Sequence, residues 1–314
     1  MQTIQRIKTF DNSTHGIVEL VTVLVAVTEY TARVLTVTGG RELPSGALSP
    51  IHHSLQAGVR DWVHKQTAQP MGYVEQLYTF VDTHRQNQDG LPVLYVSYLG
   101  LVNEAQDLAA DAIWCDWYQY FPWEDTRCTT WQARIEYILQ ALKHWADNAP
   151  SRVQSNKRHQ RIQIVWGTGT YTWMDDMALL RYEMLYEAGL ITESPTLLQG
   201  FDIGQTGIYM NKNHRRVLAT ALARLRAKIK YRPVIFELMP EQFTLLALQK
   251  SIETLTGCTL HKQNFRRQIF HQALIEPCSK DTVGMRGRPA QLYRFKDNVL
   301  LERSLSSTRL PVSK

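Results

Sequence analysis

The sequence predicts an α+β protein built from a larger N-terminal module and a smaller C-terminal module. Strand patterns alternate with a helix pattern over about the first 100 residues, which is typical of a sheet covered by helices. The middle of the chain is aromatic-rich and helical, and its end joins two short helices to a basic turn. With 314 residues, of which 44% are hydrophobic, the chain is long enough for two hydrophobic cores.

The N-terminal module is expected to alternate strands with one helix. Hydrophobic runs predict strands at residues 18–27, 33–38, 73–81 and 93–102. A helix is expected over residues 52–66, after a loop marked by Pro44 and Gly46. The longest apolar run, residues 17–27, contains Glu19 and is far shorter than the roughly 20 residues that a membrane helix needs. We therefore expect a strand there and no contact with a membrane.

The segment from about 103 to 161 is expected to be a helical insert in this module. It is rich in aromatic residues and contains a helix pattern over residues 131–145. A further strand is predicted at residues 162–166. The next helix, from about Trp173 to Glu187, should end at Gly189, because glycine relieves a left-handed cap.

A basic connector helix is expected over about 213–230, with apolar residues forming a buried stripe at helical spacing. The cations around it follow one another without an intervening acid: Lys212, Arg215, Arg216, Arg224, Arg226, Lys228, Lys230 and Arg232. A solvated helix face is the usual explanation of such a run, and contact with nucleic acid is the alternative. The net charge of the chain, +6, is modest for a nucleic-acid binder.

The end of the chain has the pattern of a winged helix-turn-helix. A helix over Thr244–Leu255 carries apolar residues at helical spacing and stops at Gly257. A second helix, residues 260–270, places its large apolar residues on one face and basic and amide side chains on the opposite face, which suits a DNA major groove. A basic hairpin at 284–290 and a strand at 291–295 complete the motif.

DNA contacts are expected from this motif, because cations neutralise phosphates and amide or guanidinium groups hydrogen-bond to base edges. The candidate DNA-binding residues are Thr244, Lys262, Gln263, Asn264, Arg266, Arg267, Arg286, Arg288 and Arg294. Gln263 and Asn264 can address adenine and the arginines guanine, but the sequence does not decide which residue contacts a base. A winged helix that serves protein contact is the alternative, and Asn264 can instead cap its own helix.

The cysteines and the start of the chain indicate a cytoplasmic protein. Cys115, Cys128, Cys258 and Cys278 show no short paired spacing, so neither a zinc site nor a disulfide framework is expected. The first residues lack the layout of a secretion signal. We expect reduced thiols and no bound cofactor or metal.

The stretch from Leu43 to Lys65 resembles the Nudix box, in which a glycine, a glutamate and an Arg-Glu-hydrophobic-any-Glu-Glu sequence stand at fixed intervals. Gly46 and Arg60 take the glycine and arginine positions. The acidic positions hold His52, Asp61, His64 and Lys65. In active Nudix enzymes those carboxylates hold the magnesium that activates water on a diphosphate. The resemblance therefore implies the loop geometry without the metal chemistry, and the histidines are expected to face solvent.

Four segments near the end of the chain carry a second resemblance: residues 214–234, 236–245, 264–267 and 287–295. They are similar to the Nudix-related transcriptional regulators of NAD metabolism, which join a Nudix-like sensor to a winged helix. The aromatic insert and the box without its acids favour the NadQ-type lineage over the NrtR lineage.

This resemblance implies a Nudix-like α/β/α sandwich with a helical insert, over 1–230, then a winged helix at 231–303. The tail at 304–314 is rich in serine and is expected to be disordered. The resemblance further implies a homodimeric repressor of NAD biosynthesis genes that binds a double-stranded DNA operator. An adenine nucleotide such as NAD, ADP-ribose or ATP would be its effector.

Effector contacts are expected from the insert and from the turn before the box, because flat rings and charges together can stack a base and hold a ribose or phosphate. The candidates are Arg41, Tyr120, Trp123, Glu124, Asp125 and Arg127. An ordinary core or interface is the alternative explanation for such an aromatic cluster.

Two other classes of protein remain open on the sequence. A Nudix hydrolase acting on ADP-ribose or a related diphosphate would need displaced acids such as Asp61, Glu42, Asp82 or Glu104. Turnover with magnesium would favour that enzyme. A protein-interaction adaptor is the third class, and it would bind no DNA sequence specifically.

Overall fold

The computed structural model describes residues 18–72, 74–86, 92–231, 234–280 and 290–296. Its larger sheet is six-stranded, in the order β4-β5-β1-β2-β6, and β3 pairs with β1 off this path. The strands are β1 (Val18–Thr28), β2 (Thr31–Thr36), β3 (Ser45–Ala47), β4 (Val74–Gln86), β5 (Pro92–Leu101) and β6 (Ile113–Asp116). β1 runs parallel to β5, and the other pairs are antiparallel.

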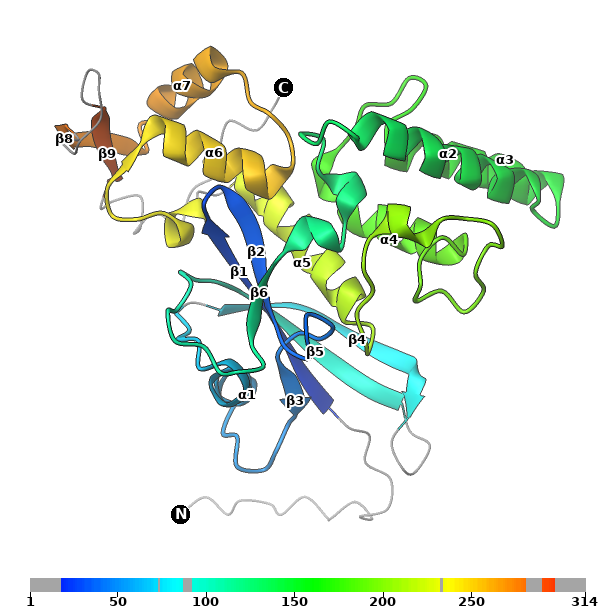
Figure 1. Ribbon diagram of the computed structural model, residues 1–314, viewed down its shortest axis with the longest axis horizontal. Coiled ribbons are helices and arrows are strands. Elements are labelled where there is room, and N and C mark those ends of the chain that lie inside the picture. The colour runs from blue at the N-terminus through cyan, green and yellow to red at the C-terminus, as the bar shows by residue number, and fades with distance from the viewer. Residues whose placement is uncertain (1–17, 73, 87–91, 232–233, 281–289, 297–314) are drawn as a thin grey trace, which may run out of the picture.

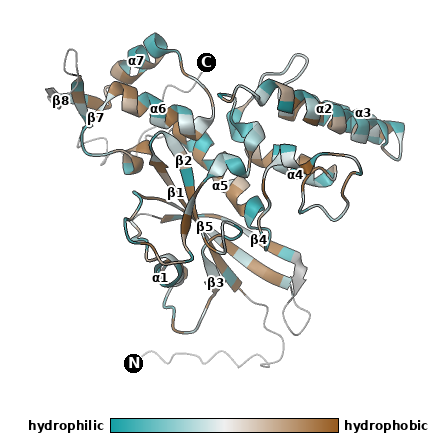
Figure 2. Ribbon diagram, in the orientation of Figure 1, coloured by the Kyte–Doolittle hydropathy of each residue, from teal (hydrophilic) through white to brown (hydrophobic). Residues whose placement is uncertain are grey.

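Helices cover both faces of this sheet, so its central strand is buried on both sides and reads as a continuous apolar run. On one face, helix α1 (Leu55–Thr67) packs Val59 against Leu20. On the other face, helix α5 (His214–Tyr231) contributes Leu222 to the cluster that contains Val23 of β1. These layers confirm the predicted α/β/α sandwich, with the most hydrophobic strands at its centre (Figures 1 and 2).

The helical insert forms a two-helix arm that projects from one side of the molecule (Figure 1). The longer helices of this region are α2 (Trp131–Asp147), α3 (Arg152–Trp166) and α4 (Ala178–Glu187). The short 3-10 helices are η1 (Trp117–Gln119), η2 (Pro122–Glu124), η3 (Asp175–Met177) and η4 (Ile203–Thr206).

The strand predicted at residues 162–166 is wrong, because this segment is the last part of α3. Ile162, Val165 and Trp166 are buried at helical spacing, and Gly167 ends the helix with a φ of 61°. A short run of β-branched residues does not distinguish a strand from a buried helix end. The neighbouring helix packs against these residues and decides the outcome.

The C-terminal module contains the two predicted helices and a three-stranded sheet in the order β7-β9-β8. Its elements are η5 (Val234–Leu238), β7 (Phe243–Thr244), α6 (Leu245–Thr256), α7 (Lys262–His271), β8 (Ile275–Lys280) and β9 (Gln291–Phe295). The hydroxyl of Thr244 caps α6 by accepting from the Ala247 amide at 3.1 Å. Residues 281–289 and 297–314, and with them most of the predicted hairpin and the predicted tail, lie outside the described residues.

One hydrophobic cluster runs through both modules, although the chain is long enough for two cores. It extends from Val23 of β1, through Leu222 of α5, to Leu248 and Ile252 of α6. The winged helix is therefore packed on the sandwich and its insert. In the part of the chain that the structure describes, no helix is both long and apolar enough to cross a bilayer.

Candidate nucleic-acid interface and Nudix-like box

The outer face of α7 is polar and exposed, as the helical spacing predicts. Phe265 and Ile269 are buried against α6. The five predicted DNA-binding residues of this helix are all exposed: Lys262, Gln263, Asn264, Arg266 and Arg267. The guanidinium of Arg267 donates to the Asn264 side-chain oxygen at 2.9 Å, which lines up two polar groups on the same face. Their contact with a base stays a prediction.

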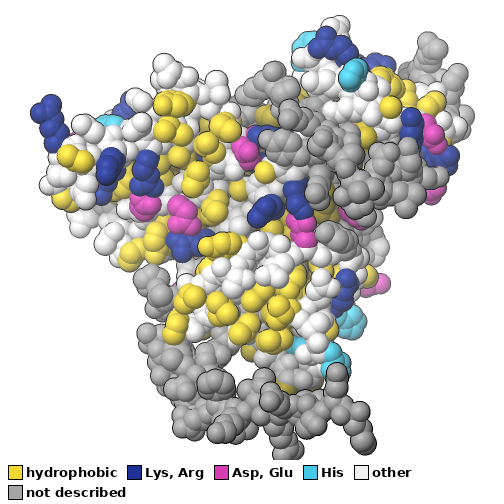
Figure 3. Space-filling model, turned by 180° about the vertical axis from the view of Figure 1, so that it is seen from behind, with side chains coloured by type: hydrophobic (Ala, Val, Ile, Leu, Met, Phe, Trp, Pro, Cys, Tyr) yellow, Lys and Arg dark blue, Asp and Glu magenta, His cyan; other side chains and the backbone are white. Residues whose placement is uncertain are grey.

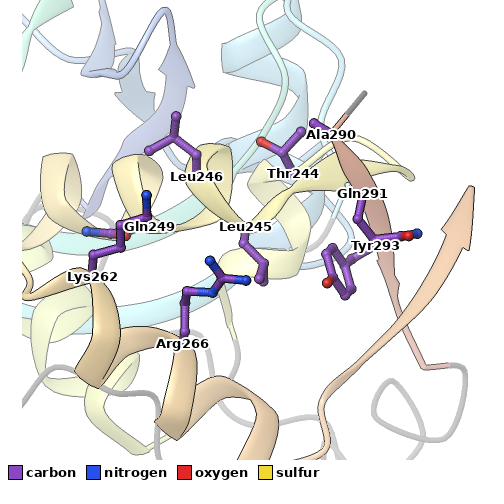
Figure 4. Close-up of a pocket in the computed structure, with 9 residues that line it drawn as sticks. All are labelled: Thr244, Leu245, Leu246, Gln249, Lys262, Arg266, Ala290, Gln291 and Tyr293. Atoms are coloured by element: carbon purple, nitrogen blue, oxygen red, sulfur yellow. The ribbon is translucent and has the colours of Figure 1, made fainter. Parts of the chain in front are cut away.

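A groove of about 210 Å³ lies between the start of α6, α7 and β9. Its lining residues are Thr244, Leu245, Leu246, Gln249, Lys262, Arg266, Ala290, Gln291 and Tyr293 (Figure 4). Lys262 and Arg266 project from α7 toward the N-terminal turn of α6, where helix N–H groups carry partial positive charge (Figure 4). Among the described residues that line the groove none is acidic, and the two charged ones, Lys262 and Arg266, are cations that can attract a phosphate.

Of the three arginines predicted for the wing, Arg294 is among the described residues. Arg294 of β9 donates to Glu276 of β8 at 2.7 Å, and both side chains are more than a third exposed. An ion pair with this exposure contributes little to stability, so a phosphate can take the place of the glutamate. Arg286 and Arg288 lie outside the described residues.

The basic run around α5 is not the solvated face that usually explains such a run, and its contact with nucleic acid stays a prediction. Most of its cations pair with acids of other elements: Lys212 with Glu42, Arg215 with Glu193, Arg216 with Glu183, Arg226 with Glu124, Lys228 with Glu75, and Lys230 with Asp175 and Asp176. Arg224 is exposed, and Arg232 lies outside the described residues. In the middle of the face seen in Figure 3, several lysines and arginines lie beside acids.

A buried charge cluster joins the insert to α4 and α5. Glu124 accepts from Arg181 Nε at 2.6 Å and from Arg226 Nη1 at 2.5 Å, and all three side chains are fully buried. Arg181 also stacks on the Trp173 ring, 3.8 Å from its centroid. Burial alone would raise the pKa of Glu124, but the two arginines outweigh it and hold that pKa below its ordinary value.

The prediction that Tyr120, Trp123 and Glu124 contact an effector conflicts with their positions, because each is 0% exposed. The Tyr120 hydroxyl donates to the Gly40 carbonyl at 2.6 Å, and burial raises the pKa of this tyrosine. Trp123 packs edge-on against Phe121. These side chains build the interior of the insert, which is the alternative that the sequence left open.

The other three effector candidates keep accessible surface. Arg127 and Asp125 form a two-bond ion pair, at 2.7 and 3.0 Å, beside the Tyr118 ring. Arg41 lies on a separate turn, with its guanidinium 4.2 Å from the centroid of the Tyr209 ring. No local pattern points to Tyr209, because nothing along the chain places it beside residue 41.

The box keeps its local geometry around Gly46. A Cβ at this position would lie 2.1 Å from the Trp62 ring, so only glycine allows the helix to approach β3. Trp62 Nε1 donates to the Ala47 carbonyl at 3.0 Å, and Arg60 donates to the carbonyls of Met71 and Gly72. These contacts tie the loops at both ends of α1 to the helix.

The one acid of the box, Asp61, is occupied by its neighbours. It accepts from Lys65 Nζ at 2.7 Å and lies 3.1 Å from His52 Nε2, and these hydrogen bonds lower its pKa. His53 and His64 are exposed as expected, whereas the His52 side chain is only 5% exposed and faces Asp61. Within the described ranges, no three His, Cys, Asp or Glu side chains gather as metal ligands would.

The displaced acids of the hydrolase alternative are engaged elsewhere. Glu104 pairs with Arg33, Glu42 pairs with Lys212, and Asp82 accepts from Asn213 at 2.8 Å. None of these pairs includes a residue of the box. The structure thus joins a Nudix-like domain to a winged helix whose helix α7 has an exposed, basic face.

Comparison with known proteins agrees with this class. Residues 235–295 match the family model of the NrtR DNA-binding winged helix domain. The chain is 39% identical over 83 residues to the ADPR responsive transcriptional repressor NtrR of Acinetobacter baylyi. This match covers 26% of the chain and spans only 33% of that protein.

Two solved structures share the whole fold. NrtR of Shewanella oneidensis in complex with a 27mer DNA is 20% identical and has a TM-score of 0.52, covering 92% of this chain and 98% of that one. A second structure of the same NrtR is 18% identical with a TM-score of 0.51, covering 94% and 98%. The expected combination of a Nudix-like domain and an NrtR-type winged helix is confirmed. The preference for the NadQ-type lineage stays a prediction.

Proposed function

We propose that the protein is a DNA-binding repressor of NAD biosynthesis genes, acting in the cytoplasm under the control of an adenine nucleotide. The observation that carries this proposal is the NrtR-type winged helix at residues 235–295, whose α7 exposes cations beside an acid-free groove. The relative from Acinetobacter is named an ADP-ribose-responsive repressor, which makes ADP-ribose the first effector to test, ahead of NAD and ATP.

The geometry supports a division of labour on DNA. The exposed face of α7 enters the major groove, where Gln263, Asn264 and Arg267 are placed for base edges. Lys262 and Arg266, with the start of α6, hold a backbone phosphate in the adjacent groove. The hydroxyl of Thr244, whose oxygen caps α6, can donate a hydrogen bond to the same phosphate.

A homodimer fits this function, because a two-fold operator needs two α7 helices about one helical turn of DNA apart, roughly 34–36 Å. Among the described strands, β4 lies at an edge of the larger sheet and exposes Tyr78 (57%) and Val81 (53%), which is unusual for a long edge strand. We assign this edge to contact with the second copy. Light scattering should give twice the monomer mass, and Tyr78→Ser with Val81→Ser should lower it.

The Nudix-like domain binds its nucleotide without cleaving it in this proposal. Lys65 neutralises Asp61, and a hard divalent cation needs several free oxygens. Among the predicted effector contacts, we place a phosphate at Arg41, whose guanidinium lies on Tyr209. Arg41→Ala should weaken ADP-ribose binding measured by calorimetry. Conversion of ADP-ribose to AMP and ribose phosphate with magnesium, abolished by Asp61→Ala, would instead establish a hydrolase.

Mobility shift with DNA from upstream of NAD biosynthesis genes tests the repressor directly. The parent chain should retard this DNA and not a scrambled duplex of equal length. Arg266→Ala should bind more weakly, whereas Arg152→Ala, an exposed arginine on the arm, should match the parent. Equal retardation of both duplexes, or no retardation of either, would contradict the proposal.

A further inference from the structure

The C-terminal end of α6 is held by the effector domain. The last turn of any helix leaves carbonyl groups without a partner in the helix. Here the effector domain supplies the partners: Tyr118 Oη donates to Thr254 O at 2.7 Å, Arg226 Nε to Leu255 O at 3.1 Å, and Thr126 N and Oγ1 to Gly257 O at 2.8 and 2.7 Å. We call this set of contacts the α6 latch.

The close approach depends on Gly257. Its φ is +73°, and a Cβ there would lie 2.2 Å from the Glu124 carbonyl oxygen and 2.9 Å from Tyr118 Oη. Any side chain would therefore strain the backbone and also push α6 away from the insert. The sequence explains this glycine as a helix stop, and the structure adds a contact between modules.

The donors of the latch are fixed in the interior of the effector domain. Arg226 of α5 donates to the side chain of Glu124 at 2.5 Å and to its carbonyl at 3.1 Å, while Glu124 also binds Arg181 of α4. The guanidinium of Arg226 faces the negative end of the α6 dipole, which strengthens the contact. The connector, the insert and α4 thus meet at one point on the winged helix.

The recognition helix follows α6 as one unit. Glu253 of α6 accepts from the Leu260 amide at 2.9 Å, and Gln249 donates to the Leu260 carbonyl at 2.9 Å, which braces the turn before α7. A rotation of α6 about its C-terminal end therefore carries α7 with it.

We propose that the α6 latch sets the orientation of the winged helix relative to the effector domain and transmits nucleotide binding to α7. Its DNA and nucleotide readouts rest on the proposed function, but the latch itself does not. A nucleotide alters DNA affinity only if it binds the latched and released arrangements with different affinity. Without the latch, the shared hydrophobic cluster still holds α6, but the C-terminal end of α6 no longer sets its orientation.

Distance measurement between spin labels tests the latch without DNA or nucleotide. Cys128 beside the arm and Cys278 on β8 are both exposed and take the labels, and Cys115→Ser removes a third, half-buried thiol. Labelled chains are diluted with unlabelled ones, so that only distances within a chain count. Gly257→Ala should broaden the distance distribution. Gly200→Ala is the matched control, because its φ is +77° and nothing lies within 4 Å of its added Cβ.

A second variant covers the case in which Gly257→Ala does not fold. Thr126→Val with Tyr118→Phe adds no bulk and removes two hydroxyl donors, one half-buried and one buried, which should shift the latch about tenfold or more toward release. It should broaden the same distribution and bring the ratio of operator affinities with and without ADP-ribose close to one. A narrow, parent-like distribution in this folded variant would overturn the latch. Broadening in a protein that binds no operator would leave the latch standing and refute the repressor instead.

Discussion

Replacing Glu124 by glutamine should be among the most destabilising single changes in this chain. The carboxylate accepts three hydrogen bonds from Arg181 and Arg226, at 2.6, 3.0 and 2.5 Å, and no side chain of the three reaches solvent. Glutamine keeps the shape but removes the charge and turns an amide NH₂ toward guanidinium donors. Both arginines then remain buried without a counter-charge.

The size of the effect follows from that burial. Removing one partner of a buried ion pair costs about 3–5 kcal/mol, whereas an exposed pair is worth about 0–1 kcal/mol. Glu187→Gln is therefore the control, because it breaks an equally well-aligned pair with Arg161 whose side chains are 43% and 46% exposed. Urea unfolding followed by circular dichroism measures both variants. A loss below about 1 kcal/mol in Glu124→Gln would refute the role of the cluster.

Three further predictions concern the charge cluster in acid, the contacts of α7 with DNA, and the packing of the box. The difference in unfolding free energy between the parent and Glu124→Gln should narrow as the pH falls below 4.5, the ordinary glutamate pKa. A carboxylate whose pKa is lowered by folding contributes its full stability above the ordinary pKa and loses it as the pH falls through the lowered pKa. A difference that widens in acid would contradict this prediction. Arg267→Ala should weaken operator binding by about 1–3 kcal/mol if it contacts a base, and Arg266→Ala should lower the salt slope by about 1 if it contacts only phosphate. Unchanged affinity and slope in both would remove α7 from the interface. Gly46→Ala should cost about 1–3 kcal/mol in urea unfolding, because the methyl group meets Trp62, and Gly72→Ala, with open space around it, should cost far less.

Much of the fold could be predicted, because local periodicity reflects which face of an element is buried. Strands β1, β2, β4 and β5, helix α1, the connector and the two helices of the winged module follow from apolar spacing and from caps such as Thr244 and Gly257. The short strands β3 and β6 were not predicted, because they lie in segments expected to be a loop and a helical insert. The end of α3 was predicted wrongly because its burial against α4, and not local preference, fixes its conformation.

Part of the candidate site could also be predicted from local spacing, and part of it could not. The exposed face of α7 follows from helical spacing alone, since Phe265 and Ile269 define its buried side. Pairings across the chain have no local signal: Arg226 meets Glu124 across 102 residues, so a basic run without acids looked free of partners. The aromatic residues near 120 could equally line a pocket or fill a core, and only the packing of α4 and α5 decides for the core.

Operator binding measured in the presence of ADP-ribose and magnesium, with the nucleotide analysed afterwards, tests the central claim most directly. A regulator with a non-hydrolytic effector domain should change its operator affinity as ADP-ribose is added, and all of the ADP-ribose should be recovered intact. Unchanged affinity across the titration, or conversion of ADP-ribose to AMP and ribose phosphate, would contradict the account.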